Sequence, residues 1–543
     1  MRLNYKSKFK SGEKMDFHKA MLKDDRRRFY LPVKRILKNN GVQNAGLLLE
    51  NQAFQTVIHY SSNIVLFNPG DSILLDFGQS VHGGIRFNQE ESPGVIRVSF
   101  GESISEAIGE ANEDSSRKKA VLELPNYGML EYGNTVFRFV EIKNIGEIPI
   151  RCQNIMAVVL EQDLEVTGSF ESSDERLNQI WKTAIRTVHL CMQDYIYDGA
   201  KRDRIVWMGD MHPEIRGILC GFSDTKIIRR SFEFLMSQSS PDYPMNEYYT
   251  YSCWFIISLW DYLCVTSDFD FIYKHADYIE AVIKKFAAYV SGDGKECIPE
   301  RRFLDWPNEA FLQAKNAGIH ALLYWMMSAG SKLLRFIGRD SSIPEQAAQK
   351  SATYIPDPDG RKAPAALLTL TGLADRRDVL ETEPFQNVST FYGFYMLLAK
   401  DTIPALQLIR NYWGAMLDFG ATSFWEDFDL KWTENATGID EFPVKGKKDI
   451  HADFGNYCYL GLRHSLSHGW SCGPAPFLSE RVLGVKFIAP GTVSVKPDPG
   501  DLEYIKGTVP VPSGLITVEA DKSGKQKITL PDGIRLFEGD SHV

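Results

Sequence analysis

The stretch SDERLNQIWKTAIRTV at residues 173–188 marks the point where the sequence changes from a strand-like to a helix-like pattern. Ser173 or Asp174 can cap a helix, because either side chain can accept a hydrogen bond from a free backbone amide of the first turn. Apolar residues then recur at helical spacing, and these are Leu177, Ile180, Trp181, Ala184, Ile185 and Val188. The stretch therefore predicts an amphipathic helix that opens a long helical region.

The helical pattern continues downstream of this first helix. Further helices are predicted at about residues 224–238, 250–267, 269–290, 315–336, 362–373, 388–399 and 402–418. A bundle, a solenoid or a closed toroid of helical hairpins would each accommodate such a series. The sequence shows no fixed period that would favour the solenoid.

Strand-like sequence lies on both sides of the helical region. Short alternating runs such as residues 72–77, 94–100 and 135–142 come before it, with Gly and Pro at the joins, and they predict an antiparallel sandwich. Beyond Phe487 the runs TVSVKPDP, GLITVEA and QKITLPDG indicate strands again. We therefore predict a β, α, β order, with boundaries at residues 1–165, 166–484 and 485–543.

Length and composition describe a globular protein of about three domains, with 543 residues of which 44% are hydrophobic. The net charge of −9, from 61 basic and 70 acidic residues, argues against nucleic acid as a partner. No run of 18 apolar residues predicts a membrane helix, and the Lys-rich N-terminus lacks the apolar core of a secretory signal. A cytoplasmic protein with no membrane partner is expected.

The cysteines and the common ligand-binding motifs give no sign of a metal or cofactor. The eight cysteines are scattered without a CxxC pair, so most of them are expected to be buried free thiols. Neither the phosphate-binding GxxxxGK[ST] pattern nor the dinucleotide-binding GxGxxG pattern is present. We therefore expect no cofactor and no metal, and carboxylate chemistry is the remaining candidate.

The densest polar and aromatic cluster is DGAKRDRIVWMGDMHPE at residues 198–214, directly after the first helix. Its glycines favour an irregular loop over a continued helix, and loops on a rigid scaffold often carry binding groups. Its carboxylates Asp198, Asp203 and Asp210 alternate with Arg202, Arg204 and Trp207. A surface cluster of salt bridges is the alternative interpretation from composition alone.

A second cluster, GATSFWEDFD, places Trp425 beside Glu426 and Asp427. An acid next to an aromatic ring suits a sugar site, because the ring covers the apolar face of a pyranose while the carboxyl group handles hydroxyls or protons. A helix end with a solvated acidic face would show the same residues.

A third cluster, HSLSHGWSCGP, brings His464, His468 and Trp470 close together in sequence. Two histidines four residues apart can bind a metal, but no third ligand stands in an HExxH-type context. A structural or sugar-contacting role is favoured for them. Hydrolysis of a glycoside needs one protonated acid and one ionised base or nucleophile, and acids so far apart in sequence can meet only in a closed fold.

At these clusters the chain resembles the α-L-rhamnosidases, family 78 of the glycoside hydrolases. The family signature reads Asp-Cys-Pro-x-Arg-Glu-Arg-x-x-Trp-x-Gly-Asp, and the residues in register with it are Asp198, Arg202, Asp203, Arg204, Trp207, Gly209 and Asp210. The GATSFWEDFD segment is similar to a second family signature, Gly-Ala-Thr-Thr-x-Trp-Glu. The sequence after residue 483 is similar to the C-terminal β-sandwich of the family.

This resemblance implies an (α/α)6 barrel, flanked by N-terminal and C-terminal antiparallel β-sandwiches, that hydrolyses rhamnosides with inversion. It implies that Asp203 is the general acid and Glu426 the general base. The residues that it implies bind rhamnose are Asp198, Arg202, Trp207, Asp210, Asp305, Trp306, Trp425 and His468, with Asp305, Trp306 and His468 matching less specifically. The implied partner is a carbohydrate, and a homo-oligomer stays open.

The chain departs from the family pattern in three ways. Gly199 and Ala200 replace the usual Cys-Pro, so the loop can differ in shape. The acid position holds Asp203 where the family generally has Glu, which shortens the reach of the proton by about a bond length. The N-terminal region also leaves room for one sandwich and no extra sugar-binding module.

Two alternative functions follow from these departures and from the scaffold. The first is a catalytically silent sugar-binding protein, suggested by Asp203 and Gly199. The second is another helical-toroid enzyme, such as a hydrolase of unsaturated uronides or a lyase. That enzyme would need a basic cluster for a uronate carboxylate, and the arginines available for it are Arg202, Arg204, Arg301 and Arg302.

Overall fold

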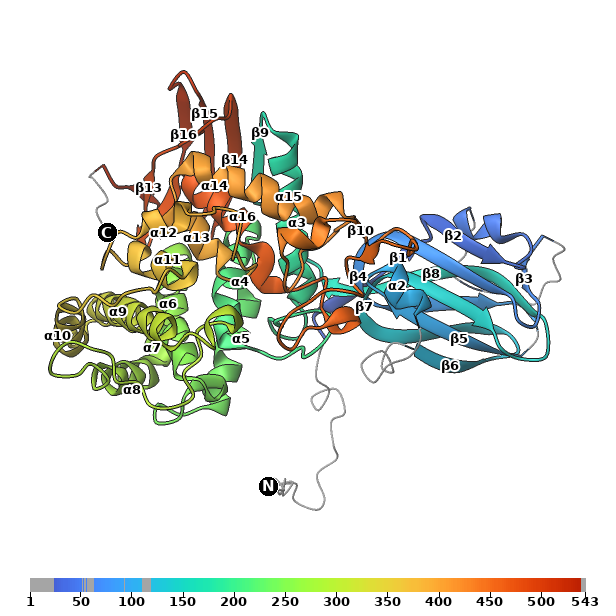
Figure 1. Ribbon diagram of the computed structural model, residues 1–543, viewed down its shortest axis with the longest axis horizontal. Coiled ribbons are helices and arrows are strands. Elements are labelled where there is room, and N and C mark those ends of the chain that lie inside the picture. Colours follow the sequence, from blue (N-terminus) through green and yellow to red (C-terminus); the bar gives the residue numbers. More distant parts are fainter. Residues whose placement is uncertain are drawn as a thin grey trace, which may run out of the picture.

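The computed structural model describes residues 24–50, 52, 55, 63–91, 93–109 and 119–538. An N-terminal β part, a central helical part and a C-terminal β part follow one another along the chain (Figure 1). The N-terminal β part lies at one end of the long axis, and the C-terminal strands lie against the helices at the other end (Figure 1). The Lys-rich N-terminus, on which the prediction of no secretory signal depends, lies outside the described residues.

The N-terminal part is one hydrogen-bonded, antiparallel set of strands. The strands are β1 (Arg26–Pro32), β2 (Arg35–Asn40), β3 (Val65–Phe67), β4 (Ser72–Gln89), β5 (Gly94–Gly101), β6 (Lys119–Leu124), β7 (Gly128–Asn144) and β8 (Ile150–Gln162). Their order is β1-β8-β4-β7-β5-β6, with β2 on β4 and β3 on β8. The runs predicted at 72–77, 94–100 and 135–142 are confirmed as parts of β4, β5 and β7.

The core of the N-terminal part is aromatic and β-branched, as the alternating pattern predicts. Phe137 packs edge-on against Phe77 and, at 4.9 Å between ring centroids, against Phe100. All three rings are buried. A short helix, α2 (Ile104–Ile108), follows β5 and is capped by Ser103, whose hydroxyl accepts the Glu106 amide. This helix lies on the side of the sheet that faces the helical part (Figure 1).

Helices dominate the central part of the chain. They are α3 (Glu175–Cys191), α4 (Met208–Gly221), α5 (Lys226–Gln238), α6 (Tyr249–Thr266), α7 (Phe269–Lys274), α8 (Ala276–Ala287), α9 (Leu312–Phe336), α10 (Ser342–Ser351), α11 (Lys362–Leu370), α12 (Arg377–Glu381), α13 (Gly393–Ala399), α14 (Thr402–Leu408), α15 (Gly414–Asp418) and α16 (Pro474–Phe477). The predicted first helix is confirmed as α3. Its cap is Asp174, whose carboxylate accepts the amides of Arg176 and Leu177.

Two expectations about the helices were wrong. The cluster at 198–214 is not a loop throughout, because α4 begins at Met208 and includes both Gly209 and Pro213. Gly209 is required there by packing, since a Cβ would lie 2.4 Å from the Tyr251 ring. The helix predicted at 269–290 is two helices, because His275 leaves the helical conformation at φ −110° and ψ 13°.

The C-terminal part contains two sheets. Its strands are β12 (Val485–Ala489), β13 (Thr492–Val495), β14 (Tyr504–Val511), β15 (Gly514–Asp521), β16 (Gln526–Thr529) and β17 (Arg535–Leu536). A three-stranded sheet runs β12-β13-β17, and a four-stranded sheet runs β16-β15-β14-β9. Strand β9 (Ser169–Ser172) comes from the segment just before α3, so the two ends of the helical part are joined through one sheet.

The long connection between α15 and α16 reaches from the helices to the N-terminal sheet. It carries the two-stranded parallel pair β10 (Ala436–Thr437) and β11 (Lys448–Asp449). The amide of Ile104 in α2 donates to the Ile439 carbonyl at 2.9 Å. In Figure 1 this connection lies beside β4, β7 and α2. The N-terminal sheet therefore contacts the loops that end the helical part.

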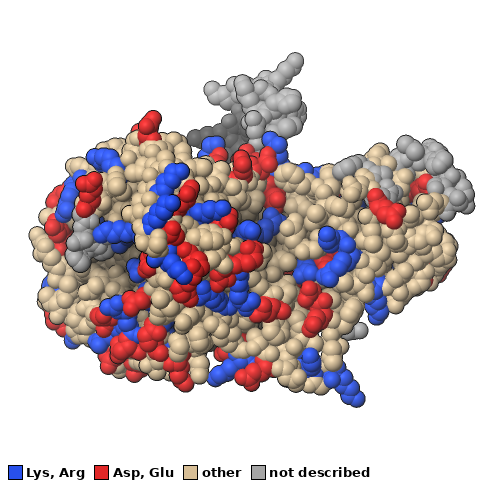
Figure 2. Space-filling model, turned by 90° about the horizontal axis from the view of Figure 1, so that it is seen from above, with Lys and Arg blue, Asp and Glu red and all other residues tan. Residues whose placement is uncertain are grey.

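The charges on the surface and the state of the cysteines agree with what the sequence predicts. On the face shown in Figure 2, basic and acidic side chains are interspersed. The basic run at 26–28 shares this mixed character, since Arg27 pairs with Asp163 and Arg28 with Glu131. The eight cysteines are free thiols, and six of them are buried. Among the residues that the structure describes, no helix is long and apolar enough to cross a membrane.

Candidate active site

The loop between α3 and α4 presents the first group of predicted site residues. Asp198 closes it, because its amide donates to the Ile205 carbonyl at 3.1 Å and its Oδ1 accepts the Ile205 amide at 2.9 Å. Asp203 and Arg204 at the tip have φ values of 55° and 52°. Asp tolerates this left-handed backbone better than most side chains, so the backbone gives a reason for the shorter acid at position 203.

The segments around Glu426 and His464 lie side by side and support the second predicted carboxylate. The Glu426 amide donates to the Ser465 carbonyl at 2.9 Å, and the Ser465 amide donates back to Glu426 Oε2 at 3.1 Å. Next to this pair, the Asp427 amide donates to His464 Nε2 at 2.8 Å. The second and third sequence clusters therefore form one site.

Arg202 brings the two predicted catalytic carboxylates together. Its Nη1 lies 3.2 Å from Asp203 Oδ2, and its Nη2 contacts Glu426 Oε1. Its Nε donates to the Arg463 carbonyl at 3.1 Å. Positions more than two hundred residues apart in sequence thus share one guanidinium. The Asp203 side chain is 40% exposed and that of Glu426 is 4% exposed, so the first acid is in contact with solvent and the second is buried.

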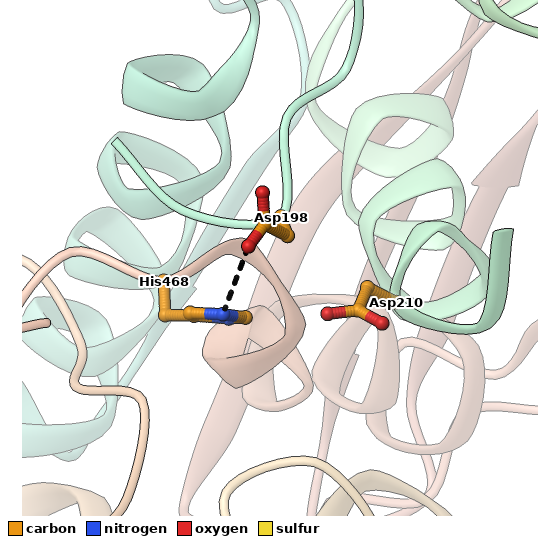
Figure 3. A group of neighbouring side chains, drawn as sticks. All are labelled: Asp198, Asp210 and His468. Atoms are coloured by element: carbon orange, nitrogen blue, oxygen red, sulfur yellow. Dashed lines mark ion pairs between the residues drawn. The ribbon is translucent and has the colours of Figure 1, made fainter. Parts of the chain in front are cut away.

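A buried group of Asp198, Asp210 and His468 lies beside Glu426 (Figure 3). One oxygen or nitrogen from each residue lies within 4.8 Å of those of the other two. His468 Nε2 is 3.9 Å from Asp198 Oδ2 and 3.6 Å from Glu426 Oε1. Such a group could hold sugar hydroxyls or a divalent cation, so the expectation of no metal stays a prediction.

Burial controls the ionisation of this group. Burial and the nearby charge of Asp210 hold the pKa of Asp198 well above its usual range. Burial and the charge of Glu426 do the same to the pKa of Asp210. Burial raises the pKa of Glu426 to about 7 against the opposing charge of Arg202, and burial lowers the pKa of His468. Burial thus favours the uncharged forms of these four groups.

Glu214 is a buried acid at this site that the sequence analysis did not single out. It lies one turn after Asp210 on α4 and is completely buried. Burial, together with the charges of Asp210 and Asp198, raises its pKa well above the usual range. Its Oε1 lies 1.7 Å from where a Cβ on Gly469 would stand, so a side chain at 469 would displace the Glu214 carboxyl group. The i, i+4 spacing from Asp210 would have revealed it had the start of α4 been recognised.

The predicted sugar-binding residues Trp207 and Trp306 differ in how close they lie to the buried acids. Trp207 directly precedes α4 and is half-buried, with its ring edge-on to Tyr251 at 5.9 Å. Tyr251 in turn donates to Asp210 Oδ1 at 3.4 Å, which places Trp207 next to the buried acids. Trp306 is 36% exposed and stacks on Tyr457.

Asp305 lines a cavity of about 190 Å³ together with Asn308 and Arg361. Its Oδ1 accepts the Asn308 amide and side chain at 3.1 and 2.6 Å, and burial raises its pKa to about 6. The structure thus places Asp305 and Trp306 at the edge of the site, and the Asp198 group at its centre.

The sugar-packing role predicted for Trp425 is not supported. Its ring is completely buried and lies edge-on to Phe428 at 5.5 Å. Glu426 points to the site, and its neighbour in sequence points into the core instead. Trp425 is therefore a core residue of the segment that carries Glu426.

We expect Trp425→Ala to lower the thermal unfolding midpoint clearly, because removing a buried Trp side chain costs about 3–5 kcal/mol. Trp306→Ala is the matched control, since that ring is partly exposed and its loss should change the midpoint much less. Differential scanning calorimetry of both variants measures this. An unchanged midpoint for Trp425→Ala together with weaker rhamnose binding would restore the sugar-packing role.

The sequence contains the residue spacing of a serine-hydrolase motif, but the structure does not place its serine where a substrate could reach it. Residues 469–473 read GWSCG, which has the GxSxG spacing of a nucleophile elbow. Ser471 is completely buried, however, and its hydroxyl contacts the Trp425 carbonyl. A nucleophile must reach substrate, so Ser471 serves to anchor the Glu426 segment.

The basic cluster that a uronide enzyme would need is dispersed. Arg301 pairs with Glu247 at 2.5 Å, and Arg302 pairs with Glu296. Arg204 donates to the Asn134 carbonyl at 2.7 Å. Of the four arginines considered from the sequence, Arg202 is the one that contacts the carboxylates of the site.

Part of the chain matches a known family model. Residues 165–330 match the model described as bacterial alpha-L-rhamnosidase 6 hairpin glycosidase domain. An alpha-L-rhamnosidase of Formosa agariphila is 24% identical over 180 residues, which cover 31% of this chain and 19% of that protein. The chain thus spans a minor part of the length of this relative.

Solved structures show the same fold. A family GH78 rhamnosidase of Bacillus sp. GL1 superposes with a TM-score of 0.70 at 21% identity, covering 88% of this chain and 55% of that one. A rhamnosidase from Klebsiella oxytoca, with rhamnose bound, gives 0.65 at 20% identity over 83% and 95%. An α-L-rhamnosidase of Streptomyces avermitilis gives 0.68 at 14% identity over 94% and 49%. The resemblance in fold is confirmed: the chain has the fold of the solved α-L-rhamnosidases, and its residues 165–330 match the model of a bacterial alpha-L-rhamnosidase 6 hairpin glycosidase domain.

Proposed function

We propose that this protein is an inverting glycoside hydrolase that releases terminal α-L-rhamnose from a rhamnoside or oligosaccharide. The observation that carries the proposal is the pairing of Asp203 and Glu426 on Arg202, beside the buried group of Asp198, Asp210 and His468. The family domain at residues 165–330 supports it independently.

In the proposed mechanism Glu426 deprotonates a water on one face of the anomeric carbon while Asp203 protonates the departing oxygen on the other. An inverting reaction needs about 6.5–9.5 Å between the two carboxyl groups so that the water fits. Arg202 supports the pairing of these roles in one site, because its Nη1 contacts Asp203 and its Nη2 contacts Glu426. Inversion at the anomeric carbon is the expected stereochemical result.

The buried polar group would bind the sugar. Asp198 and Asp210 can accept hydrogen bonds from sugar hydroxyls and, in the protonated form that burial favours, donate to them, and His468 Nε2 lies 3.9 Å from Asp198 Oδ2. Trp207, Asp305 and Trp306 would complete the pocket wall. Because no metal is needed for an acid and a base to act, the reaction requires no cofactor.

The finer architecture is part of the same proposal. We propose that the helices close into an (α/α)6 barrel at residues 166–484, between β-sandwiches at 1–165 and 485–543. Asp203 and Glu426 would then stand at one mouth of this barrel. Their convergence from segments near its two sequence ends supports such closure.

A catalytically silent sugar-binding protein is the second candidate. The observation that favours it is the exposed Asp203, which stands where the family generally has a longer Glu. The test is the release of nitrophenol from p-nitrophenyl α-L-rhamnopyranoside, with a panel of other aryl glycosides as controls. Turnover of the rhamnoside alone supports the hydrolase. Rhamnose binding without turnover of any glycoside supports the silent protein, and turnover of an unsaturated uronide overturns both.

The raised pKa of Glu426 predicts the acidic limb of the pH profile. A general base must be ionised, so kcat/KM should rise as the pH increases through about 7, the pKa to which burial raises Glu426. Initial rates on p-nitrophenyl α-L-rhamnopyranoside between pH 4 and 9 measure this limb. An acidic limb of the pH profile centred at pH about 4.3, the pKa of an ordinary Glu, would argue against Glu426 as the base.

A further inference from the structure

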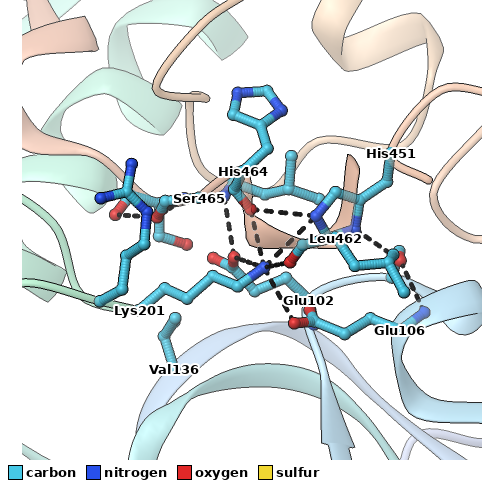
Figure 4. Close-up of polar contacts among 12 residues, drawn as sticks. Glu102, Glu106, Val136, Lys201, His451, Leu462, His464 and Ser465 are labelled. Carbon is cyan, nitrogen blue, oxygen red and sulfur yellow. Dashed lines mark hydrogen bonds and ion pairs between the residues drawn. The ribbon is translucent and has the colours of Figure 1, made fainter. Parts of the chain in front are cut away.

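Lys201 precedes Arg202 in the loop of the proposed acid, and its side chain points toward Glu102 and Glu106 of the N-terminal part (Figure 4). The side chain is 2% exposed. Its ammonium lies 2.8 Å from Glu106 Oε1, 2.6 Å from the Leu462 carbonyl and 2.7 Å from the His464 carbonyl. These three contacts match the three N–H donors of an ammonium, and His451 Nε2 is a further neighbour at 3.4 Å.

The carboxylates that contact the Lys201 ammonium, Glu102 and Glu106, belong to the N-terminal part. Glu106 lies on α2, and its second oxygen accepts the Glu102 amide at 2.7 Å. Glu102 Oε2 is 3.5 Å from the Lys201 ammonium and accepts the Leu466 amide at 2.8 Å. Both glutamates are buried. Two acids from the N-terminal β part therefore contact the helical part, at the loop of Lys201 and at the backbone of Leu466.

The segments that Lys201 joins are the ones that hold the two proposed catalytic groups. The ammonium holds the carbonyls of residues 462 and 464, and the next residue, Ser465, exchanges two hydrogen bonds with Glu426. On the other side, Lys201 is two residues before Asp203. Its position therefore sets where the acid loop stands relative to the base.

Apolar packing closes the contact around this ion cluster. Ala200 packs with Val136 of β7 and with Leu190 and Cys191 at the end of α3. A dry surrounding strengthens the attraction between the ammonium and the carboxylates, and it makes the loss of either partner costly. The cluster is thus a rigid connection and not a solvated surface pair.

We propose that Lys201, Glu102 and Glu106 form a positioning clamp through which the N-terminal β part fixes the spacing of Asp203 and Glu426. This inference rests on the proposed function for its catalytic consequence. It makes the N-terminal part a component of the active site, although none of its residues touches the sugar in the proposed mechanism. None of the three clamp residues takes part in the chemistry itself.

The test compares three variants with the wild type. Lys201→Met removes the ammonium, and Lys201→Met with Glu106→Gln removes it together with one buried negative charge, which restores charge balance and supports folding. Lys400→Met is the matched control, since Lys400 is another 2% exposed lysine, bound to the Leu380 carbonyl and Glu381 away from the site. Rates on p-nitrophenyl α-L-rhamnopyranoside and hydrogen–deuterium exchange of residues 198–207 and 462–468 are measured for each.

The clamp predicts a fall in kcat of at least about tenfold for both Lys201 variants, because misplaced catalytic groups lose rate steeply. It predicts a KM within about threefold of the wild type, because the sugar-binding groups are not removed. Exchange should speed up in both segments and stay unchanged in β4 and β7. Lys400→Met should keep the wild-type rate and the wild-type exchange in both segments.

Two results would overturn the clamp. One is a double variant with wild-type kcat, which would give Lys201 a purely structural role. The other is exchange that stays unchanged in both segments, and this readout needs no activity. If the wild type does not turn over the rhamnoside, the proposed function fails on that assay while the exchange data still decide whether the clamp exists. If Lys201→Met does not fold, Glu106→Gln alone carries the same comparison, with smaller shifts expected in the same segments.

Discussion

Glu426→Gln should lower kcat on p-nitrophenyl α-L-rhamnopyranoside about a thousandfold, within the range expected for loss of a general base. Gln is isosteric and can still accept the Ser465 amide, so the segment should keep its place. Gln cannot accept a proton from water at any accessible pH. The acidic limb of the pH profile should therefore disappear with the activity.

The control for this variant is Asp429→Asn in the same segment. Asp429 caps the short helix at Leu430–Thr433 through the Lys431 amide, and Asn caps helices equally well. This control should keep most of the activity. If Glu426→Gln keeps more than about a tenth of the wild-type rate, a loss far below the usual effect of removing a general base, Glu426 is not the base.

Asp203→Asn should show a loss that depends on the leaving group. A general acid matters most for a poor leaving group, so we expect about a 10²–10⁴-fold loss on an alkyl or glycosyl rhamnoside. The loss should be far smaller on 2,4-dinitrophenyl α-L-rhamnopyranoside, whose phenolate leaves without a proton. Rates on the two substrates, measured side by side, give the ratio that identifies the acid.

Asp203→Glu is the companion variant, because it keeps the carboxyl group and adds the reach that the family generally has. It should retain turnover and the leaving-group dependence of the wild type. Equal losses by Asp203→Asn on both substrates would contradict the role of Asp203. The acid would then be sought at Asp198, whose pKa burial raises well above its usual range.

The periodic parts of the fold could be predicted from the sequence, and the parts set by tertiary contacts could not. Helix α3 and its Asp174 cap follow from spacing and one side chain. The start of α4 was missed because Gly209 and Pro213 are poor helix formers. Packing of Gly209 against Tyr251 outweighs that local preference.

The site was predicted unevenly for similar reasons. The convergence of Asp203 and Glu426 follows from family resemblance, since spacing alone says nothing about contacts across two hundred residues. Trp425 was assigned to the sugar because it adjoins Glu426, but neighbouring side chains in an irregular segment point in different directions. Lys201 carries no sequence signal at all, because a buried lysine and a surface lysine look the same in a charged run.

The most direct test of the proposed function is the anomer that the enzyme forms first. Hydrolysis of p-nitrophenyl α-L-rhamnopyranoside is followed by proton NMR from the first minutes, before mutarotation mixes the anomers. The proposed acid and base predict β-L-rhamnose as the first product, with the α anomer appearing later. Initial release of α-L-rhamnose would show a retaining reaction, and the absence of any rhamnose would contradict the proposed hydrolase.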